Sequence, residues 1–527
     1  MNTGTFEILG GDYASGGLAS SGLKQQLRWL GTDAGVLRRA MIAAYEAEMN
    51  VVVHARRGVL RYALDAHRLD VVVLDEGPGI PDIAQAMQEG FSTASAEARA
   101  LGFGAGMGLP NIRRNTDSLT VRSVVGQGTE VCFSLLLEPA PAASEAESSL
   151  GIVPERCTRC LRCLSVCPTA ALRLRPAGPV LLAGLCVDCG ACLAACRFGA
   201  LVPLGGQPAL PEAGTGPLAM PAALAGQLPG GPDCFVAGLD ELGRGAPLWL
   251  DPWEHELADA VSRHAAALPD DEDPVISPAC PGVLQLLALR FPTLLPLVAP
   301  FATPLVAAWP TLAARGASLV AVCSAGLTAL RQAGAPAERL LLPAALLDPL
   351  RPVVRRLARR PRPAASPSPS PSPAPARALP PGDRLRVEGL SHVLAVLQAL
   401  ESRTLRGIRV IEPWLCDQGC LGSPLLPEDA FVAGHRLRGF APPAEPGGVF
   451  VQPRPAALVA RPGIRLDPDL AKAVAKLAWL DSLTRSLPGR DCAVCGAPSC
   501  SALAEDLVLG RIPALDCPYQ AHAERTR

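Results

Sequence analysis

The stretch CTRCLRCLSVCP (157–168), followed by CVDCGACLAAC (186–196), decides the organisation of this chain. In each run two residues separate the first cysteine from the second and the second from the third, and three residues separate the third from the fourth. Three thiolates so close together can hold three irons of one cubane cluster, with the fourth ligand supplied by the other run. The spacing therefore predicts a compact module with two [4Fe–4S] clusters. Zinc is the alternative metal for CxxC pairs, and the triple spacing followed by Cys-Pro disfavours it.

This module resembles the bacterial two-cluster ferredoxins. The one departure is that the second run ends in Cys196-Arg197 rather than in Cys-Pro. The resemblance implies that each cluster takes three ligands from one run and the last cysteine of the other. Cluster one would be held by Cys157, Cys160, Cys163 and Cys196, and cluster two by Cys186, Cys189, Cys192 and Cys167.

Length and charge narrow the class of protein. The chain has 527 residues, which suggests three or four domains, and its net charge of −1 gives no bulk attraction to nucleic acid. The 18 cysteines fall mostly in groups of four, unlike those of a small secreted disulfide scaffold. No signal peptide opens the chain, because Met1–Gly10 is polar. We expect a cytoplasmic protein that binds protein partners and no nucleic acid.

One uncharged run, between Arg290 and Arg315, is long enough to cross a bilayer. Five prolines interrupt it, and each one removes a backbone donor and breaks a helix. Buried turns and short helices are the preferred interpretation, so we expect no membrane span.

The region before the cysteines carries a polar helix face. Glu46, Asn50 and His54 are four residues apart in a helix expected over 36–56, so they lie on one side of it. A polar face on an otherwise apolar helix needs a polar partner, such as a metal ion.

Two glycine-rich motifs follow this helix. A strand expected over 71–74 ends in DEGPGI (75–80), which places an acid at the carboxyl end of the strand. GFGAGMGL (102–109) then opens a helix expected over 110–114. Glycines at a helix start let backbone N–H groups close on phosphate.

These elements, in this order, resemble the Bergerat-fold ATPases, and most closely the anti-sigma-factor serine kinases, over about residues 23–137. The resemblance implies an ATP site in which Asn50 holds Mg²⁺, Asp75 accepts the adenine amino group and Thr129 binds near the adenine. Glu46 would be the general base that activates a protein Ser or Thr hydroxyl. The glycine boxes would contribute Gly77, Gly79, Gly104, Gly106 and Gly108.

Two alternatives stand beside this kinase interpretation. The fold could bind ATP without turnover, or it could have lost nucleotide binding. A histidine kinase is disfavoured, because no pair of helices with a phosphoacceptor histidine precedes the domain. Phe91-Ser92-Thr93 corresponds to the lid region, and GQGT (126–129) to the turn into the closing strand.

Isolated cysteines follow in three pieces: SPACPG (277–282), VCSAG (322–326) and EPWLCDQGC (412–420). Their order resembles the hydrogenase domain at the C-terminal end of the [FeFe]-hydrogenase large chain, over about residues 230–435. The resemblance implies a cubane held by Cys280, Cys323, Cys416 and Cys420.

Two departures from that family bear on function. Ala279 replaces the proton-relay cysteine, and Gly326 replaces a lysine that grips a cyanide of the two-iron subsite. An anionic buried ligand would then lack its cation. We expect a single cubane without hydrogen turnover; unrelated buried thiols are the alternative.

The last cysteine group, DCAVCGAPSC (491–500) with Cys517-Pro518, resembles the small four-cysteine [4Fe–4S] domain of corrinoid and electron-transport proteins. The implied ligands are Cys492, Cys495, Cys500 and Cys517. Two cysteines have no expected role: Cys132 in a strand and Cys234 in a loop.

The sequence thus predicts a multidomain α/β and α+β chain. Its expected parts are a Bergerat α/β-sandwich ATPase over 20–138, a ferredoxin-like module over 148–205, a hydrogenase-like α/β domain over 206–440 with a disordered Pro/Ser insert at 361–382, and a small helical Fe–S domain over 470–527. Expected cofactors are four [4Fe–4S] clusters, ATP and Mg²⁺.

The leading functional hypothesis is a redox-responsive signalling protein that couples cluster state to ATP binding and to phosphotransfer. Its expected partners are an anti-sigma antagonist, another regulator or a redox protein. The alternatives are an electron-transfer protein in which ATP acts as a conformational effector, and a genuine hydrogenase-type enzyme.

Overall fold

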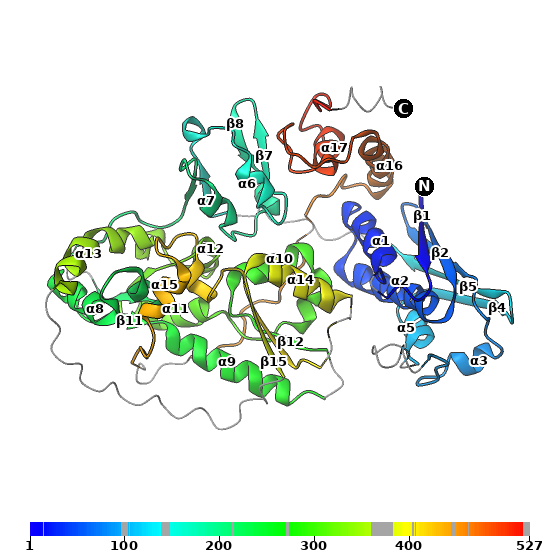
Figure 1. Ribbon diagram of the computed structural model, residues 1–527, viewed down its shortest axis with the longest axis horizontal. Helices are drawn as coiled ribbons and strands as arrows, with labels where there is room; N and C mark the ends of the chain where they lie inside the picture. Colours follow the sequence, from blue (N-terminus) through cyan, green and yellow to red (C-terminus); the bar gives the residue numbers. More distant parts are fainter. Residues whose placement is uncertain are drawn as a thin grey trace. The chain divides into compact units, whose positions relative to one another are not determined.

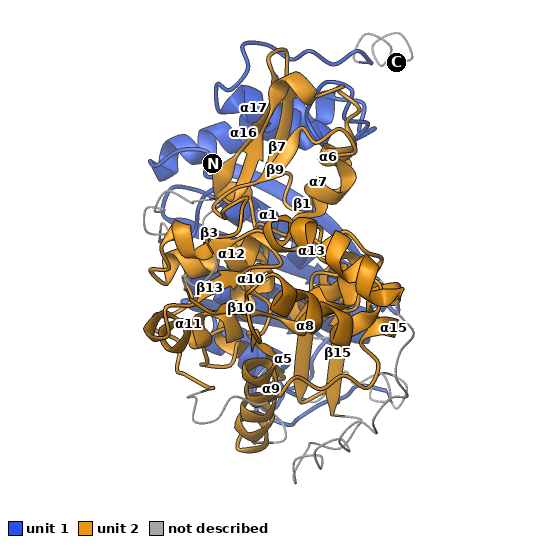
Figure 2. Cartoon of the chain, turned by 90° about the vertical axis from the view of Figure 1, so that its left-hand side faces the viewer, with its two compact units in different colours: residues 1–145, 460–527 blue, residues 146–459 orange. Residues whose placement is uncertain are grey.

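The computed structural model describes residues 1–13, 15–95, 98, 104, 106–138, 148–212, 216–269, 273–359, 383–402, 405, 407–443, 450–461 and 463–519. The chain divides into two compact units (Figure 2). One unit consists of residues 1–145 together with 460–527, and the other of residues 146–459. The predicted insert at 361–382 lies outside the described residues.

The first unit is built on a five-stranded antiparallel sheet with the strand order β1-β2-β3-β5-β4 (Figure 1). In β2 every second residue is buried, which is the pattern of a sheet with one covered face. The edge strand β1 pairs with β2 along its whole length, from Asn2 opposite Leu64 to Leu9 opposite Arg57. The sheet therefore begins at Asn2, before the predicted start at residue 20. The strands are β1 Asn2–Leu9, β2 Arg57–Leu64, β3 Arg68–Asp75, β4 Ser118–Val124 and β5 Gly128–Leu136.

Helices cover the apolar face of this sheet. The long helix α2 packs on β1, β2, β3 and β5, and α1 and α5 pack on α2. Asp33 caps α2 by accepting hydrogen bonds from the Gly35 and Val36 N–H groups. The helices are α1 Leu18–Trp29, α2 Ala34–His54, α3 Ile83–Ala86 and α5 Gly108–Arg114.

Two helices from the end of the chain complete the first unit. α16 (Leu470–Ser486) contacts β1 and α1, and α17 (Cys500–Val508) packs on α16. Leu477 and Leu480 are fully buried in the same hydrophobic core as α1 and α2. The two ends of the sequence therefore share one core.

The second unit opens with the module that contains the two cysteine runs, in which two short helices each follow a cysteine loop. The module is closed by two antiparallel strand pairs. Its elements are β6 Leu150–Ile152, η1 Pro154–Arg156, α6 Arg162–Ser165, β7 Leu172–Arg175, β8 Gly178–Leu181, η2 Ala183–Leu185, α7 Ala191–Ala195 and β9 Leu201–Pro203.

Two small parallel sheets organise the rest of the second unit, with strand orders β11-β10-β13-β14 and β12-β16-β15. Parallel strands need helical crossovers, so this part is an α/β structure. The strands are β10 Leu218–Met220, β11 Leu248–Trp249, β12 Val275–Ile276, β13 Ser318–Val320, β14 Leu340–Leu341, β15 Arg384–Glu388 and β16 Val410–Trp414. The α-helices are α8 Gly231–Glu241, α9 Asp251–Ala266, α10 Pro281–Arg290, α11 Pro304–Ala314, α12 Ser324–Gln332, α13 Pro343–Ala358, α14 Leu390–Glu401 and α15 Ala430–Arg436. The 3-10 turns are η3 Ala222–Gln227, η4 Pro292–Leu297, η5 Ala337–Arg339 and η6 Gly419–Gly422.

Two sequence-based expectations are decided by this fold. The uncharged run between Arg290 and Arg315 forms the short elements η4 and α11, and no helix among the described residues is long and apolar enough to cross a membrane. Cys234 lies in α8 rather than in the loop that we expected. The helix forms there because Pro232, in its first turn, has a backbone preset for a helix start.

Candidate functional site

Asp75 stands at the end of β3 in a small hydrogen-bond network. Its Oδ1 accepts hydrogen bonds from the N–H groups of Gly77, at 2.8 Å, and Thr129, at 3.2 Å. The hydroxyl of Thr129 lies 2.9 Å from that of Ser123, a residue that the sequence motifs did not single out. Burial raises the pKa of the Asp75 carboxyl, and the two backbone donors oppose that shift. The network holds Asp75 and Thr129 side by side.

The first glycine box wraps closely around this carboxylate. A Cβ atom at Gly77 would lie 2.8 Å from Asp75 Oδ1. Gly79 has a φ of +75°, and a Cβ there would lie 2.4 Å from the carbonyl oxygen of Val124. A side chain at position 77 would crowd the Asp75 carboxylate, and position 79 favours glycine both for its contact and for its backbone conformation.

The second glycine box meets the polar face of α2. A Cβ atom at Gly108, the first residue of α5, would lie 2.9 Å from Asn50 Oδ1. Gly104 and Gly106 have φ values of +80° and +75°, and a Cβ at Gly106 would collide with the backbone of Gly90. The close approach of this backbone to Asn50 leaves no room for side chains, as a phosphate cradle requires.

Glu46 is held in place by a residue that the sequence analysis missed. Asn111 Nδ2, on α5, donates a 2.8 Å hydrogen bond to Glu46 Oε1. At the other end of the same helix face, burial lowers the pKa of His54 while the charge of Asp75 raises it. We call the face of α2 that carries Glu46, Asn50 and His54 the N-box, and α2 the N-box helix. This face meets α5 through Glu46 and Asn50, and its His54 lies near Asp75.

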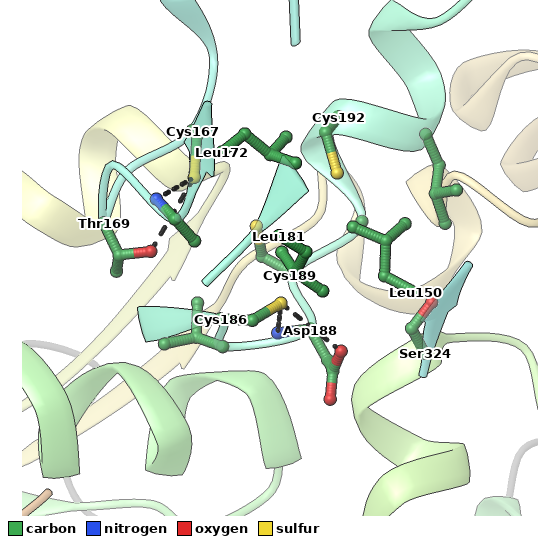
Figure 3. Close-up of a pocket in the computed structure, with 14 residues that line it drawn as sticks. Leu150, Cys167, Thr169, Leu172, Leu181, Cys186, Asp188, Cys189, Cys192 and Ser324 are labelled. Atoms are coloured by element: carbon green, nitrogen blue, oxygen red, sulfur yellow. Dashed lines mark hydrogen bonds between the residues drawn. The ribbon is translucent and has the colours of Figure 1, made fainter. Parts of the chain in front are cut away.

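The ferredoxin cysteines line two separate cavities, with the interleaved sets that the resemblance implies. Cys157, Cys160, Cys163 and Cys196 line one of them. Figure 3 shows the other, where Cys167 from the first run lies beside Cys186, Cys189 and Cys192 from the second. Backbone N–H groups point at the sulfurs: Ala171 N lies 3.2 Å from Cys167 Sγ, and Asp188 N lies 3.4 Å from Cys186 Sγ. Such donors stabilise thiolates that hold a cluster.

Backbone strain is concentrated in the cysteine loops. Among the described residues, every non-glycine residue with positive φ lies within three positions of a predicted cluster ligand. These residues are Arg159, Leu161, Ala170, Asp188, Gln418, Asp491 and Ala493. A left-handed backbone conformation costs about 1–2 kcal/mol per residue. Because it occurs only in these loops among the described non-glycine residues, we infer that the loops are shaped to wrap around a bound group.

The same geometry separates clusters from single metal ions. Among the described residues, no three His, Cys, Asp or Glu side chains converge closely enough to hold one metal ion. Zinc needs four ligands at about 2–2.3 Å, whereas a [4Fe–4S] cubane has irons at four alternating corners, sulfides at the other four, and one thiolate on each iron. Thiolates spaced around a cavity are the arrangement that such a cluster accepts.

The middle quartet of cysteines is also assembled by the fold. Burial raises the pKa of the Cys323 thiol to about 12, and neighbouring Cys280 contributes. Burial raises the pKa of Cys416 as well, with contributions from Cys280, Cys323 and the ferredoxin residue Cys189. Cys420 is partly buried and has Cys323 and Cys416 as neighbours. The four thiols therefore lie in one group, and Cys189 of the ferredoxin module lies near it.

Two further residues of this region were not identified from the sequence. Glu254 of α9 lies near Cys280 and Cys420, and burial followed by the charge of Asp251 raises its pKa to about 7. Gly326, the position of the missing lysine, donates its N–H to Cys323 Sγ at 3.2 Å, and a Cβ there would lie 2.8 Å from Leu305. A side chain at position 326 would therefore require the Leu305 side chain to move.

The last four cysteines line a cavity of their own, formed by the loop before α17 and the segment after it. Its lining includes Cys492, Cys495, Cys500 and Cys517. The Cys500 N–H donates a 2.7 Å hydrogen bond to Asp491 Oδ1, which closes the loop. The remaining cysteines, Cys132 in β5 and Cys234 in α8, line none of these three cavities.

Comparison with known families agrees with three of the four sites. A model of the histidine kinase-like ATPase domain matches residues 15–135. A 4Fe-4S dicluster domain model matches residues 149–197, and a model for an Fe-S cluster domain matches residues 487–519.

Among curated proteins, the N-terminal region is similar to the serine/threonine-protein kinase RsbT of Bacillus subtilis, with 36% identity over 97 residues, 18% of this chain and 67% of RsbT. It is also similar to the anti-sigma F factor of Caldanaerobacter subterraneus, with 37% identity over 95 residues, 17% of this chain and 62% of that factor. The chain therefore spans less than two thirds of the length of the anti-sigma F factor.

Among solved structures, the chain is similar to a variant of the [FeFe]-hydrogenase HydA1 from Chlamydomonas reinhardtii. The identity is 15% and the TM-score 0.29, over 42% of this chain and 82% of the other.

Proposed function

Because the chain belongs, through its N-terminal domain, to the histidine kinase-like ATPases of the anti-sigma-factor kinase type, and because that domain is joined to iron–sulfur domains, we propose that it is a redox-responsive regulator. In this function, the state of its [4Fe–4S] clusters controls ATP binding and phosphotransfer to a Ser or Thr of a protein partner. Its partner is an anti-sigma antagonist or another regulator of that kind. A thiol-rich protein of this type suits the reducing cytoplasm.

The observation that carries the proposal is the held position of Glu46 beside Asn50. The Asn111 hydrogen bond fixes the Glu46 carboxylate, and Asn50 meets the glycine box at Gly108. In the transfer, the hydroxyl oxygen of the partner bonds to the γ-phosphorus, the bond to ADP breaks, and Glu46 accepts the hydroxyl proton. Asn50 would hold the Mg²⁺ that neutralises the phosphates.

Four clusters are proposed, one for each cysteine quartet, within the four domains predicted from the sequence. A bound cluster supplies one-electron transfer. The protein contributes the cysteine loops, the N–H donors to sulfur and the proximity of Cys189 to Cys416.

The test is phosphotransfer from radiolabelled ATP to candidate anti-sigma-antagonist proteins, with the chain held anaerobically in its reduced and its oxidised state. We expect labelled partner in one state and at least severalfold less in the other. Glu46→Gln is the control that binds nucleotide without transfer. Absence of label in both states, with the nucleotide bound, would overturn the kinase function.

An electron-transfer protein in which ATP is a conformational effector is the second candidate function. The proximity of Cys189 to Cys416 favours it, because neighbouring clusters pass electrons between them. A chain with this second function would reduce or oxidise a redox partner at the same rate whether or not a candidate phosphoacceptor protein is present. Hydrogen turnover would require a two-iron subsite, which infrared bands from iron-bound CO and CN⁻ would reveal. We do not expect these bands with Ala279 and Gly326 in place.

A further inference from the structure

The C-terminal cysteine domain is part of the ATPase core. α16 and α17 pack on each other, and α16 packs on α1 and on the edge strand β1. The side chains of Cys495, Cys500 and Cys517 pack against the same hydrophobic core that contains Leu27 of α1 and Ala47 of α2. The eight ferredoxin cysteines belong to the other compact unit. Three of the four C-terminal cysteines therefore pack against the same core as helices α1 and α2.

A buried polar contact joins α17 to α1. The indole Nε1 of Trp29, the last residue of α1, donates a 2.9 Å hydrogen bond to Glu505 Oε1, and Glu505 is only 8% exposed. A backbone hydrogen bond also holds the segment before α16 to the end of α1, because the Leu466 N–H donates to the Trp29 carbonyl oxygen at 3.1 Å. A buried carboxylate is costly without hydrogen-bond partners. The position of α17 therefore depends on the position of α1.

The other end of α1 is fixed by the N-box helix. Glu48 of α2 is 2% exposed, and its carboxylate accepts hydrogen bonds from the backbone N–H groups of Gly17, Ala19 and Ser20 at 2.9–3.0 Å. A carboxylate in this place accepts hydrogen bonds from N–H groups at the start of α1, which have no partner within the helix, and its negative charge is favoured by the helix dipole. Glu48 lies between Glu46 and Asn50, so any displacement of α1 acts on the helix that carries both.

The element with two states is the cysteine loop itself. Asp491 and Ala493 have φ values of +46° and +59°, a conformation that L-residues adopt only when the surroundings impose it. With ligands in place around a cluster, the loop is held and α17 begins at Cys500. Without the cluster the strain is released and α17 loses its support, which supplies the bistable element that coupling requires.

We infer that the C-terminal [4Fe–4S] site regulates the nucleotide site of this chain by clamping α17 onto α1 through Glu505 and Trp29, with Glu48 passing the constraint to the N-box helix. This inference rests on the proposed ATP binding, and it assigns the control to one of the four clusters. Loss of the C-terminal cluster loosens α1 and lowers nucleotide affinity, whereas loss of a ferredoxin cluster does not.

The experiment measures the affinity of anaerobically reconstituted full-length chain for a fluorescent ADP analogue with Mg²⁺. Cys517→Ala removes a C-terminal ligand, and Cys160→Ala is the matched control in the ferredoxin module. We expect Cys517→Ala to weaken binding about tenfold and Cys160→Ala to leave it unchanged. Equal affinities of wild type and Cys517→Ala, or equal losses in both variants, would overturn the inference.

Two further measurements separate coupling from unfolding. Hydrogen exchange should show lost protection in α1 and kept protection in β3 and β5 of Cys517→Ala. If the sheet is also unprotected, Trp29→Phe decides: it keeps the C-terminal cluster and an aromatic ring but removes the donor, and it must still weaken binding. Unchanged affinity in Trp29→Phe contradicts the clamp. If wild-type protein binds no nucleotide, the proposed function fails before the inference is tested.

Discussion

Thr328 Oγ1 donates a hydrogen bond of 2.7 Å to Asp188 Oδ2. Asp188 lies between Cys186 and Cys189 in the ferredoxin module, whereas Thr328 belongs to α12, the helix that begins next to Cys323. The other oxygen, Oδ1, accepts hydrogen bonds from Ser148 Oγ and the Ser149 N–H. One buried carboxylate thus ties the second cysteine loop of the ferredoxin module to the helix that follows Cys323.

Replacing this carboxylate should change a redox potential. Asp188→Asn removes a negative charge beside two cluster sites, and an added electron then meets less repulsion. We expect the midpoint potential of cluster two to rise by roughly tens of millivolts, as measured by an EPR-monitored titration. Asp240→Asn, at an exposed position of α8, is the control and should leave all potentials in place. A lower potential in Asp188→Asn would contradict this electrostatic role.

Asp75→Asn should weaken ADP binding without lowering the stability of the fold. Asp75 is expected to accept the adenine amino group, so the variant should lose most of its ADP affinity. The folded-state pKa of Asp75 is raised by burial, so ionised Asp75 destabilises the fold at neutral pH, and that penalty disappears as the pH falls through the folded pKa. The melting temperature of Asp75→Asn at pH 7 should therefore be equal to or higher than that of the wild type.

Asp65→Asn is the control, because we expect it to change the melting temperature in the opposite direction. Hydrogen bonds from the His67 and Arg68 N–H groups lower the pKa of Asp65, so its charge stabilises the fold above the unfolded pKa, and this is lost as the pH falls through the folded pKa. We expect a lower melting temperature at pH 7 with unchanged ADP affinity. If both variants shift the melting temperature in the same direction, the assignment of the two carboxylates is wrong.

Asn111→Ala should slow phosphotransfer without abolishing nucleotide binding. The variant removes the donor that holds Glu46, and a mispositioned general base loses part of the roughly 10²–10⁴-fold that such catalysis provides. Single-turnover transfer from radiolabelled ATP measures the rate. Asn115→Ala, which loses only a hydrogen bond to the Asn111 carbonyl oxygen, controls for damage to the end of α5. A similar slowing in both variants would speak for a helix defect instead.

The cysteine quartets should load iron independently. Wild-type protein should bind about 16 iron atoms, and Cys160→Ala about 12, because each cubane needs its own ligand set. Cys132→Ala serves as the matched control, since Cys132 lies in β5 of the sheet and lines none of the three cysteine cavities. Iron and sulfide quantification after anaerobic reconstitution gives the count. Loss of iron in Cys132→Ala, or none in Cys160→Ala, would contradict the assigned ligands.

The local parts of this protein could be predicted from the sequence because their chemistry lies within a few neighbouring residues. A cubane takes three ligands from one short loop, so the spacing of Cys157, Cys160 and Cys163 was enough to indicate it. The polar face of α2 followed from the four-residue spacing of Glu46 and Asn50, which the helix period places on one side. Cys234 was assigned wrongly, because a loop and a helix start that contains proline have the same local composition.

What the sequence alone determined is the set of groups that this chain carries: cysteine loops for clusters, and a glycine-framed nucleotide site. Only the tertiary structure decided which of them act together. Trp29 meets Glu505 across 476 positions, and Asp188 meets Thr328 across 140. No periodicity or spacing encodes such pairs, because they arise from the packing of whole helices against a shared core, and the burial of polar groups there requires partners that only the folded chain supplies.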